Sequence, residues 1–207
     1  MKLKVCGLKY KENIERIAQL KVDYLGFIFY PKSKRYVGED FEMPLITSKT
    51  KTVGVFVNAD VNYIIEKVNK YNLDIVQLHG DETADYCRLA KEQLKNIEII
   101  KAFGVNEQFN FNTLNAYTNH CDYFLFDTKT KEYGGSGHHF DWKILEKYDD
   151  ALPYFLSGGI GLKEAETIKK EKTKLNAYAI DVNSKFEIEP GFKNVEMIET
   201  LINNLLI

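Results

Sequence analysis

The chain has no long apolar run, and this absence excludes one class of protein. None of the apolar stretches in its 207 residues approaches the length of about 20 residues that spans a bilayer. Lysines interrupt the apolar residues near the N-terminus, so no signal-peptide core is expected there. The sequence therefore predicts a soluble, cytoplasmic protein with no membrane partner.

A strong net charge is also absent. The 28 Lys and Arg side chains nearly balance the 30 Asp and Glu side chains, which leaves a net charge of -2 at pH 7. Binding to a phosphate backbone needs an excess of cationic side chains. We therefore expect no nucleic acid partner.

Cysteine is scarce, and the chain contains only Cys6, Cys87 and Cys121. An odd number without a secretion signal predicts reduced thiols rather than a disulfide framework. Cys87 falls in a predicted helix and Cys121 just before a predicted strand, so packing is the expected role of both. Cys6 ends the first predicted strand, and this position favours a functional role over packing.

Apolar residues are plentiful, at 44% of the chain, and they gather in short segments. These segments have the length of strands and are nearly continuous in apolarity, as in parallel strands covered on both faces. The predicted strands cover residues 3–7, 24–29, 53–57, 75–80, 97–104, 123–127, 154–159 and 177–183.

Most of these strands are separated by segments with apolar residues at helical spacing. The predicted helices cover residues 13–20, 61–71, 83–94, 162–172 and 195–206. Residues 31–52 have little periodicity and contain Pro31 and Pro44, so a long loop with a short helix is predicted there. No linker-like composition divides the chain, and residues 1–207 are predicted to form one domain.

Eight β/α units in a chain of 207 residues fit the smallest closed (β/α)₈ barrels. The alternative is a doubly wound open sheet, which usually shows one dominant nucleotide-binding loop at its switch point. Here polar residues follow several strands in turn. We therefore predict an α/β fold, a single (β/α)₈ TIM barrel of parallel strands with outer helices.

The segment 125–142, LFDTKTKEYGGSGHHFDW, combines a strand end with a glycine-rich loop. The strand stops at Asp127, and the loop contains Gly134, Gly135 and Gly137. A solvated surface turn and an active-site carboxylate under a closing loop explain these residues equally well. In a barrel, however, the carboxyl ends of the strands form the active face, which favours the second interpretation.

Two further strand ends indicate a phosphate site. SGGIG, residues 157–161, leads into the helix predicted from Leu162, and DVNS, residues 181–184, follows the last strand. Backbone N–H groups at a helix N-terminus bind anions, and these two loops form the usual phosphate site of the fold. A small phosphorylated substrate is therefore predicted. Nucleotide-binding glycine motifs are absent from the sequence.

The histidines give little support for a metal site. His138 and His139 are adjacent, so their side chains diverge, and neither His79 nor His120 has a partner at ligand spacing. His79 is expected to act as a hydrogen-bonding group. Arg35 is either a solvated loop cation or a bidentate ligand for an anionic substrate group.

The segments KVCG, GFIFYPKSKRY, VGVFV, VQLHGDE, LFDTKTKEYGGSGHHFDW, LSGGI and AIDVNS, in this order, resemble the phosphoribosylanthranilate isomerases of tryptophan biosynthesis. The resemblance extends from Lys4 to about Gly191. It implies a (β/α)₈ barrel that needs no cofactor. It also implies an Amadori rearrangement of N-(5-phosphoribosyl)anthranilate to 1-(2-carboxyphenylamino)-1-deoxyribulose 5-phosphate.

The resemblance also implies roles for individual residues. Cys6 is expected to be the general base, as a thiolate with a lowered pKa, and Asp127 the general acid. Arg35 is expected to hold the anthranilate carboxylate. The other expected substrate-binding residues are His79, Asp181, Gly158, Gly159 and Ser184, and the loop with Gly134 to Gly137 is expected to close over the substrate.

One position departs from the pattern of the family. Residues 181–187 read DVNSKFE where the family commonly has DVSSGVE, so Lys185 stands in the place of a glycine. Lys185 is strained by roughly 1 kcal/mol if that position needs a positive φ. Otherwise the loop follows another path, or the lysine adds charge to the phosphate site.

Two rival functions remain at this stage. A lyase or epimerase acting on another sugar phosphate shares the phosphate loops but leaves Cys6, Asp127 and the YPKSKRY segment unexplained. A non-catalytic sugar-phosphate-binding barrel does not need both Cys6 and Asp127. The sequence leaves open whether the protein is a monomer or a homodimer.

Overall fold

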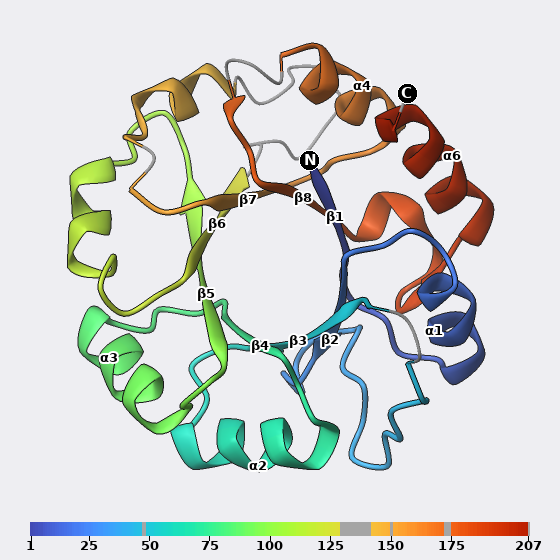
Figure 1. The fold of residues 1–207 in the computed structure, drawn as a ribbon, viewed down its shortest axis with the longest axis horizontal. Coiled ribbons are helices and arrows are strands. Elements are labelled where there is room, and N and C mark those ends of the chain that lie inside the picture. Colours follow the sequence, from blue (N-terminus) through green and yellow to red (C-terminus); the bar gives the residue numbers. More distant parts are fainter. Residues whose placement is uncertain (47–48, 129–141, 150, 172–174, 207) are drawn as a thin grey trace.

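The computed structural model describes residues 1–46, 49–128, 142–149, 151–171 and 175–206. Within these residues, eight parallel strands close into a barrel (Figure 1). They are β1 (Lys2–Val5), β2 (Tyr24–Ile28), β3 (Lys51–Phe56), β4 (Ile75–Leu78), β5 (Glu98–Val105), β6 (Tyr123–Thr128), β7 (Tyr154–Ser157) and β8 (Ala179–Val182).

The barrel is closed by direct pairing of β8 with β1. The two strands run parallel, with Lys2 opposite Ala179 and Val5 opposite Val182. An open doubly wound sheet would leave these two strands apart at its edges or order them differently. The predicted (β/α)₈ barrel is therefore confirmed.

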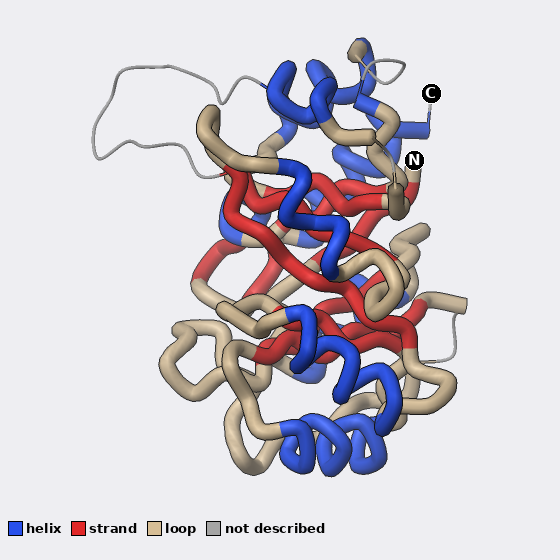
Figure 2. The backbone as a smooth tube through the Cα atoms, turned by 90° about the vertical axis from the view of Figure 1, so that its left-hand side faces the viewer, coloured by secondary structure: helices blue, strands red, loops and turns tan. Residues whose placement is uncertain are grey.

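Helices surround the barrel on its outside, as Figures 1 and 2 show. Some of them begin with a polar side chain that caps the helix, whereas the helices that start at Lys11 and Leu162 have no side-chain cap. The side chain of Asp60 accepts a hydrogen bond from Asn62 N at 2.8 Å, and that of Thr83 accepts one from Tyr86 N at 3.2 Å. In the described part of the chain, the α-helices with given bounds are α1 (Lys11–Ala18), α2 (Val61–Tyr71), α3 (Ala84–Gln93), α4 (Leu162–Lys170) and α6 (Val195–Leu206).

Shorter elements complete the connections. Three 3₁₀ helices, η1 (Phe111–Ala116), η2 (Trp142–Lys147) and η3 (Ser184–Phe186), lie in the described residues. After η3, strands β9 (Glu187–Glu189) and β10 (Phe192–Lys193) pair in an antiparallel hairpin. No helix in the described part of the chain is both long and apolar enough to cross a membrane.

The short helix predicted within residues 31–52 is wrong for the described part of that segment, 31–46 and 49–52, which contains turns, bends and extended chain before β3. Prolines and the lack of a 3.6-residue apolar period explain this result. The segment instead packs single aromatic residues onto the barrel. Phe41 contacts Phe27 on β2 and Tyr71 on α2, at ring-centroid distances of 5.7 Å and 5.4 Å.

Alternate side chains of each strand point to opposite faces, so the barrel has two separate cores. The larger core lies between the strands and the helices. The smaller core fills the interior of the barrel and consists of Tyr24, Val53, Ile75, Ile100, Ala102, Leu125, Phe155 and Ala179. Polar residues toward the carboxyl ends of the same strands are thus left on top of a packed interior.

Phe155 is fully buried in the interior core, with its ring 5.2 Å from that of Tyr24. We expect Phe155→Ala to lower the free energy of unfolding by about 3–5 kcal/mol, because the cavity left inside the closed barrel cannot collapse. Chemical denaturation measures this change. The control Leu45→Ala, at a side chain that is 87% exposed, should be nearly neutral. Equal effects of the two substitutions would contradict this packing.

Candidate active site

A cavity of about 280 Å³ lies among the residues at the carboxyl ends of the strands. Every strand of the barrel except β5 contributes to its wall, either directly or through the loop that follows. The lining residues include all the predicted site residues except Arg35: Cys6, His79, Asp127, Gly158, Gly159, Asp181 and Ser184. The barrel therefore brings together predicted site residues that are far apart in the sequence, from Cys6 to Ser184.

Cys6 lies directly after β1 and is held there by the neighbouring strands. Its N–H donates to the carbonyl of Val182 at 2.9 Å, and the N–H of Gly7 donates to that of Gly26 at 2.9 Å. Gly26 also provides the space for the thiol, because a Cβ at that position would come within 2.9 Å of Cys6 Sγ. The glycine in the second strand is therefore part of how the thiol is positioned.

The electrostatic surroundings of Cys6 include a residue that sequence reasoning missed. Lys4 lies two positions earlier on the same inner face of the barrel, is fully buried, and has Nζ 2.9 Å from Asp181 Oδ1. A lysine at an interior position of a predicted strand was the available signal, because such a charge is rarely buried without a partner.

The pKa of the Cys6 thiol is raised, and burial is the main cause. Asp181 raises this pKa further, whereas the ammonium groups of Lys4 and Lys193 oppose the change by stabilising the thiolate. The lowered pKa expected for a general base is therefore not found. Desolvation of the thiolate outweighs the two nearby cations.

Asp127, at the end of β6, has His79 as its neighbour. His79 Nε2 lies 3.7 Å from Asp127 Oδ2, and His79 Nδ1 lies 2.6 Å from Gln77 Nε2. With the Gln77 amide as donor to Nδ1, a neutral imidazole carries its proton on Nε2, which faces Asp127. Gln77, His79 and Asp127 thus form a polar row along one wall of the cavity.

The loop that carries His79 is fixed by a buried ion pair. Lys101 Nζ lies 3.0 Å from Glu82 Oε2, and both side chains are at most 2% exposed. Glu82 also accepts hydrogen bonds from the N–H groups of Asn58 and Gly80, each at 2.8 Å. Glu82 therefore ties the residue after His79 to the neighbouring loop after β3, and the N–H of His79 itself donates to the carbonyl of Phe56 at 2.8 Å.

Glycines shape the opposite wall of the cavity. Gly158 has φ of +105° and Gly159 has φ of +62°, a conformation that favours glycine. The next residues lead into α4, where Glu164 Oε2 accepts from the N–H of Gly161 at 2.9 Å. The loop after β7 thus lines the cavity next to the N-terminus of α4, and phosphate binding by its backbone N–H groups stays a prediction.

Lys185 is not strained, because its φ is not among the positive values found in the described residues. It lies within η3, so the loop after β8 follows another path, a 3₁₀ turn. Its Cβ is 3.7 Å from where a Cβ on Gly161 would lie, and Lys185 lines the cavity. The lysine is therefore beside the glycine loop after β7.

Arg35 has a partner that the sequence did not reveal. Its Nε and Nη2 donate to the carboxylate of Glu187, with the shortest contact at 2.6 Å between Nη2 and Oε2. Arg35 still borders the site, because its Cδ lies 2.7 Å from where a Cβ on Gly7 would lie, one residue after Cys6. Arg35 and Glu187 are 152 positions apart, so no local pattern connects them.

Other sequence predictions concern the two remaining cysteines, the glycine-rich loop and a metal site. Cys87 and Cys121 are free and buried, as expected for packing residues. Gly134, Gly135, Gly137, His138 and His139 lie outside the described residues. Among the residues that the structure covers, no three His, Cys, Asp or Glu side chains are arranged to hold a metal ion.

Comparison with known proteins agrees with the geometry. A family model described as N-(5'phosphoribosyl)anthranilate (PRA) isomerase matches residues 3–204. A relative from Parabacteroides distasonis named N-(5'-phosphoribosyl)anthranilate isomerase is 41% identical over 210 residues, which cover 100% of this chain and 94% of the relative.

Solved structures of similar proteins share the whole fold. The phosphoribosyl anthranilate isomerase from Thermotoga maritima has a TM-score of 0.80 and 34% identity, and the match covers 100% of this chain and 98% of that one. A second such isomerase, in complex with reduced 1-(o-carboxyphenylamino)-1-deoxyribulose 5-phosphate, has a TM-score of 0.78 and 31% identity, with coverage of 100% and 98%. The resemblance seen in the sequence motifs is confirmed over nearly the full length, and the chain belongs to the N-(5'-phosphoribosyl)anthranilate isomerase family.

Proposed function

We propose that this chain isomerises N-(5-phosphoribosyl)anthranilate to 1-(2-carboxyphenylamino)-1-deoxyribulose 5-phosphate, an Amadori rearrangement in tryptophan biosynthesis. The observation that carries the proposal is that Cys6 and Asp127 line one cavity together with the glycine loop after β7. The reaction needs an acid and a base on the same sugar, with a site for its phosphate.

Asp127 acts as the general acid and Cys6 as the general base. Protonated Asp127 donates to the ribose ring oxygen, so the C1–O bond breaks and the anilino nitrogen forms an imine with C1. The Cys6 thiolate then removes the proton from C2, which gives an enolamine. Transfer of the enol proton and protonation of C1 yield the ketose, so the atoms balance without an added redox partner.

The raised pKa of Cys6 has two consequences for this step. A more basic thiolate takes a proton from carbon more readily, but a smaller fraction of the thiol is ionised near neutral pH. Lys4 and Lys193 therefore act on the rate by increasing that fraction. Burial under the substrate also protects the thiolate from water.

The phosphate group binds at the loops after β7 and β8. Gly158 and Gly159 offer backbone N–H groups, and Ser184 offers a hydroxyl. Lys185, which lines the same cavity, adds a cation where the family commonly has glycine. Two of the possibilities for Lys185, a different loop path and added charge at the phosphate site, therefore hold together in this proposal.

The remaining substrate contacts follow from the cavity walls. Asp181 orients the amine or the sugar, and His79, beside Asp127, binds the reacting end of the ribose. Arg35 binds the anthranilate carboxylate. Closure of the loop with Gly134 to Gly137 over the substrate, a single domain, a cytoplasmic location and a monomeric or homodimeric state stay predictions.

The purified protein should convert freshly prepared phosphoribosylanthranilate without added metal or cofactor, with loss of the fluorescence of the anthranilate group. Cys6→Ser and Asp127→Asn should each lower kcat by about 10²-fold or more, because each removes one proton-transfer group. Circular dichroism checks that both variants are folded. Turnover near that of the unchanged protein in either variant contradicts the assigned role.

The same assay separates the rival functions. A lyase or epimerase would act on another sugar phosphate and leave phosphoribosylanthranilate unchanged. A binding barrel without catalysis would bind the product analogue named above but show no turnover. Absence of turnover in the folded wild-type protein would therefore reject the isomerase proposal.

Lys4→Met should raise the pKa of the Cys6 thiol further, because it removes a cation and leaves Asp181 unpaired beside the sulfur. The pH dependence of iodoacetamide alkylation measures this pKa, with the Cys6 peptide followed by mass spectrometry because Cys87 and Cys121 are also free. Lys2→Met is the matched control, on the same strand but further from the thiol.

Asp181→Asn should shift the pKa of the Cys6 thiol in the opposite direction. It also serves as a second variant in case Lys4→Met does not fold. It removes an anion that raises the pKa of Cys6, so alkylation should begin at lower pH. Alkylation profiles that coincide for Lys4→Met, Asp181→Asn and Lys2→Met would show that the buried ion pair does not control the thiol.

A further inference from the structure

Glu187 is a buried carboxylate that sits beside the cavity without lining it. Its side chain is only 5% exposed. It accepts hydrogen bonds from Arg35, from Lys193 Nζ at 2.6 Å and from the N–H of Gly191 at 3.0 Å. These donors lower its pKa to about 2 despite burial, which acts in the other direction. Glu187 is therefore ionised throughout the pH range in which enzymes are assayed.

The contact with Arg35 uses only one edge of the guanidinium. Glu187 Oε1 lies 2.8 Å from Nε, and Oε2 lies 3.0 Å from Nε and 2.6 Å from Nη2. A guanidinium has five N–H groups, and its Nη1–Nη2 edge can bind a second carboxylate side by side with the first. Among the described residues, no hydrogen bond reaches Nη1 of Arg35.

Arg35 is close to the reacting part of the site. Its side chain crosses Gly7, which has φ of +76° and follows Cys6 directly. The side chain of Asn183, which lines the cavity, lies against the same glycine, with Oδ1 2.7 Å from the position of a Cβ. Arg35 is thus packed against the residue that follows Cys6, next to a side chain of the cavity wall.

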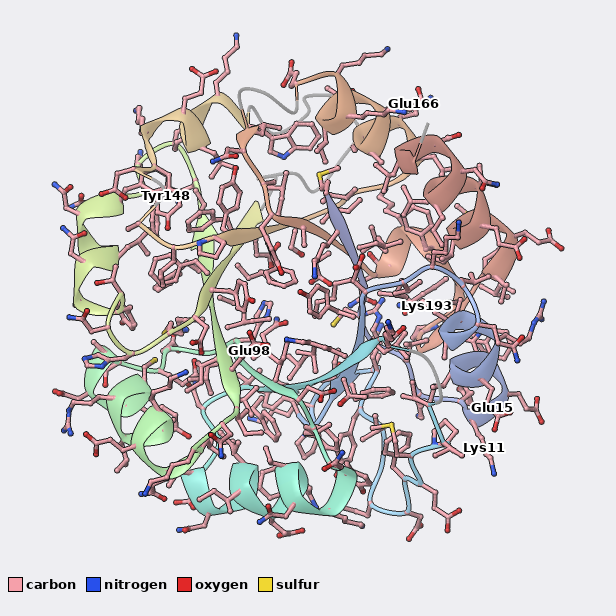
Figure 3. The ribbon with its side chains drawn as sticks, viewed as in Figure 1. Lys11, Glu15, Glu98, Tyr148, Glu166 and Lys193 are labelled. Atoms are coloured by element: carbon pink, nitrogen blue, oxygen red, sulfur yellow. The ribbon has the colours of Figure 1, made fainter. Side chains whose placement is uncertain are left out.

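Lys193 contacts Glu187 and helps to fix its position. Its side chain is fully buried, and its Nζ contacts both Glu187 Oε1 and Asn183 Oδ1 at 2.6 Å. The backbone of Lys193 is fixed by Asn13 of α1, which accepts from Lys193 N at 2.7 Å and donates to Lys193 O at 2.8 Å. In Figure 3, Lys193 lies between β1 and α1.

The charges of this cluster do not cancel. In the described residues, Glu187 is the carboxylate that contacts both Arg35 and Lys193, so these three groups carry one positive charge while the Cys6 thiol is protonated. The Arg35 side chain is 23% exposed, so this charge can attract an anion from solvent. An anionic group bound on the open edge of Arg35 supplies the missing charge.

We propose that Glu187 is a positioning residue that holds Arg35 by its Nε–Nη2 edge and thereby presents the adjoining Nη1–Nη2 edge to the carboxylate of the substrate. This inference rests on the proposed function. Lys193 keeps Glu187 in place, so the orientation of Arg35 is set before the substrate arrives. Pre-organisation of this kind increases affinity because fewer groups become ordered on binding.

A second interpretation predicts the opposite change in affinity for the substrate. If the substrate carboxylate needed the same edge of Arg35 that Glu187 occupies, Glu187 would compete with it, and its removal would tighten binding. The two interpretations are separated by the direction in which affinity changes when Glu187 loses its charge.

The test compares Glu187→Gln with Glu189→Gln, an exposed residue on the same strand β9. Two compounds are used as binding probes. One is reduced 1-(o-carboxyphenylamino)-1-deoxyribulose 5-phosphate, which has the aryl carboxylate, and the other is ribulose 5-phosphate, which lacks it. Glu187→Gln should weaken the first about tenfold or more, the size of one charge-assisted hydrogen bond, and change the second less than about twofold.

The kinetic constants of the two variants should differ in the same way as their affinities for the probes. KM for phosphoribosylanthranilate should rise in Glu187→Gln while kcat stays close to wild type, and Glu189→Gln should match wild type in both. Equal loss for both probes would mean that Glu187 only supports the loop structure and would overturn the proposal. Tighter binding of the aryl carboxylate, or no change, would overturn it as well.

A double-mutant cycle tests whether Glu187 acts through Arg35. Arg35→Ala should weaken the aryl carboxylate probe, and adding Glu187→Gln in that background should have little further effect. If Glu187→Gln does not fold, Arg35→Lys gives a second test, because an ammonium keeps the ion pair but cannot bridge two carboxylates side by side. Wild-type affinity of Arg35→Lys for this probe would overturn the proposal.

Failure of this inference is distinct from failure of the proposed function. If the wild-type protein does not turn over phosphoribosylanthranilate, the proposed function is wrong. If it does turn over and Glu187→Gln behaves like Glu189→Gln, only the role of Glu187 is wrong.

Discussion

The ion pair between Lys4 and Asp181 joins the two strands that close the barrel. The two residues are partners in the register of β1 and β8, and their side chains meet at 2.9 Å inside the barrel. A buried charge of either sign is tolerated only with a partner, so this register is electrostatically specified as well as hydrogen-bonded. Because Cys6 follows β1 directly, the same pairing determines the charges next to the thiol.

Around this pair, different loops supply different walls of the cavity. Gly158, Gly159 and Lys185 lie on the loops after β7 and β8, the row from Gln77 to Asp127 forms another wall, and Arg35 lies beside Gly7. Three buried or partly buried carboxylates, Asp181, Glu82 and Glu187, each hold a cation in a fixed place. Of these three carboxylates, Asp181 also lines the cavity, whereas Glu82 and Glu187 support the loops around it.

The successful sequence predictions concern features that local patterns encode. Continuous apolar segments identify the strands, and the residue that ends each strand, such as Asp127, falls at the active face once the barrel is assumed. The short helix predicted within residues 31–52 was wrong in the described residues, because contacts of Phe41 with other elements shape that segment. Glu187 and Lys193 were missed because their importance arises from a partner, Arg35, far away in the sequence.

The sequence by itself determined the family, the parallel barrel and the chemical types at the strand ends, because these follow from local periodicity and from motifs that lie within a few residues. Only the tertiary structure decided the pKa of Cys6, the path of the Lys185 loop and the partner of Arg35. Those properties depend on distances and solvent exclusion among side chains far apart in the sequence, such as Lys4 and Asp181, which are 177 positions apart. Coulomb energies change with separation and local dielectric, which no residue pattern records.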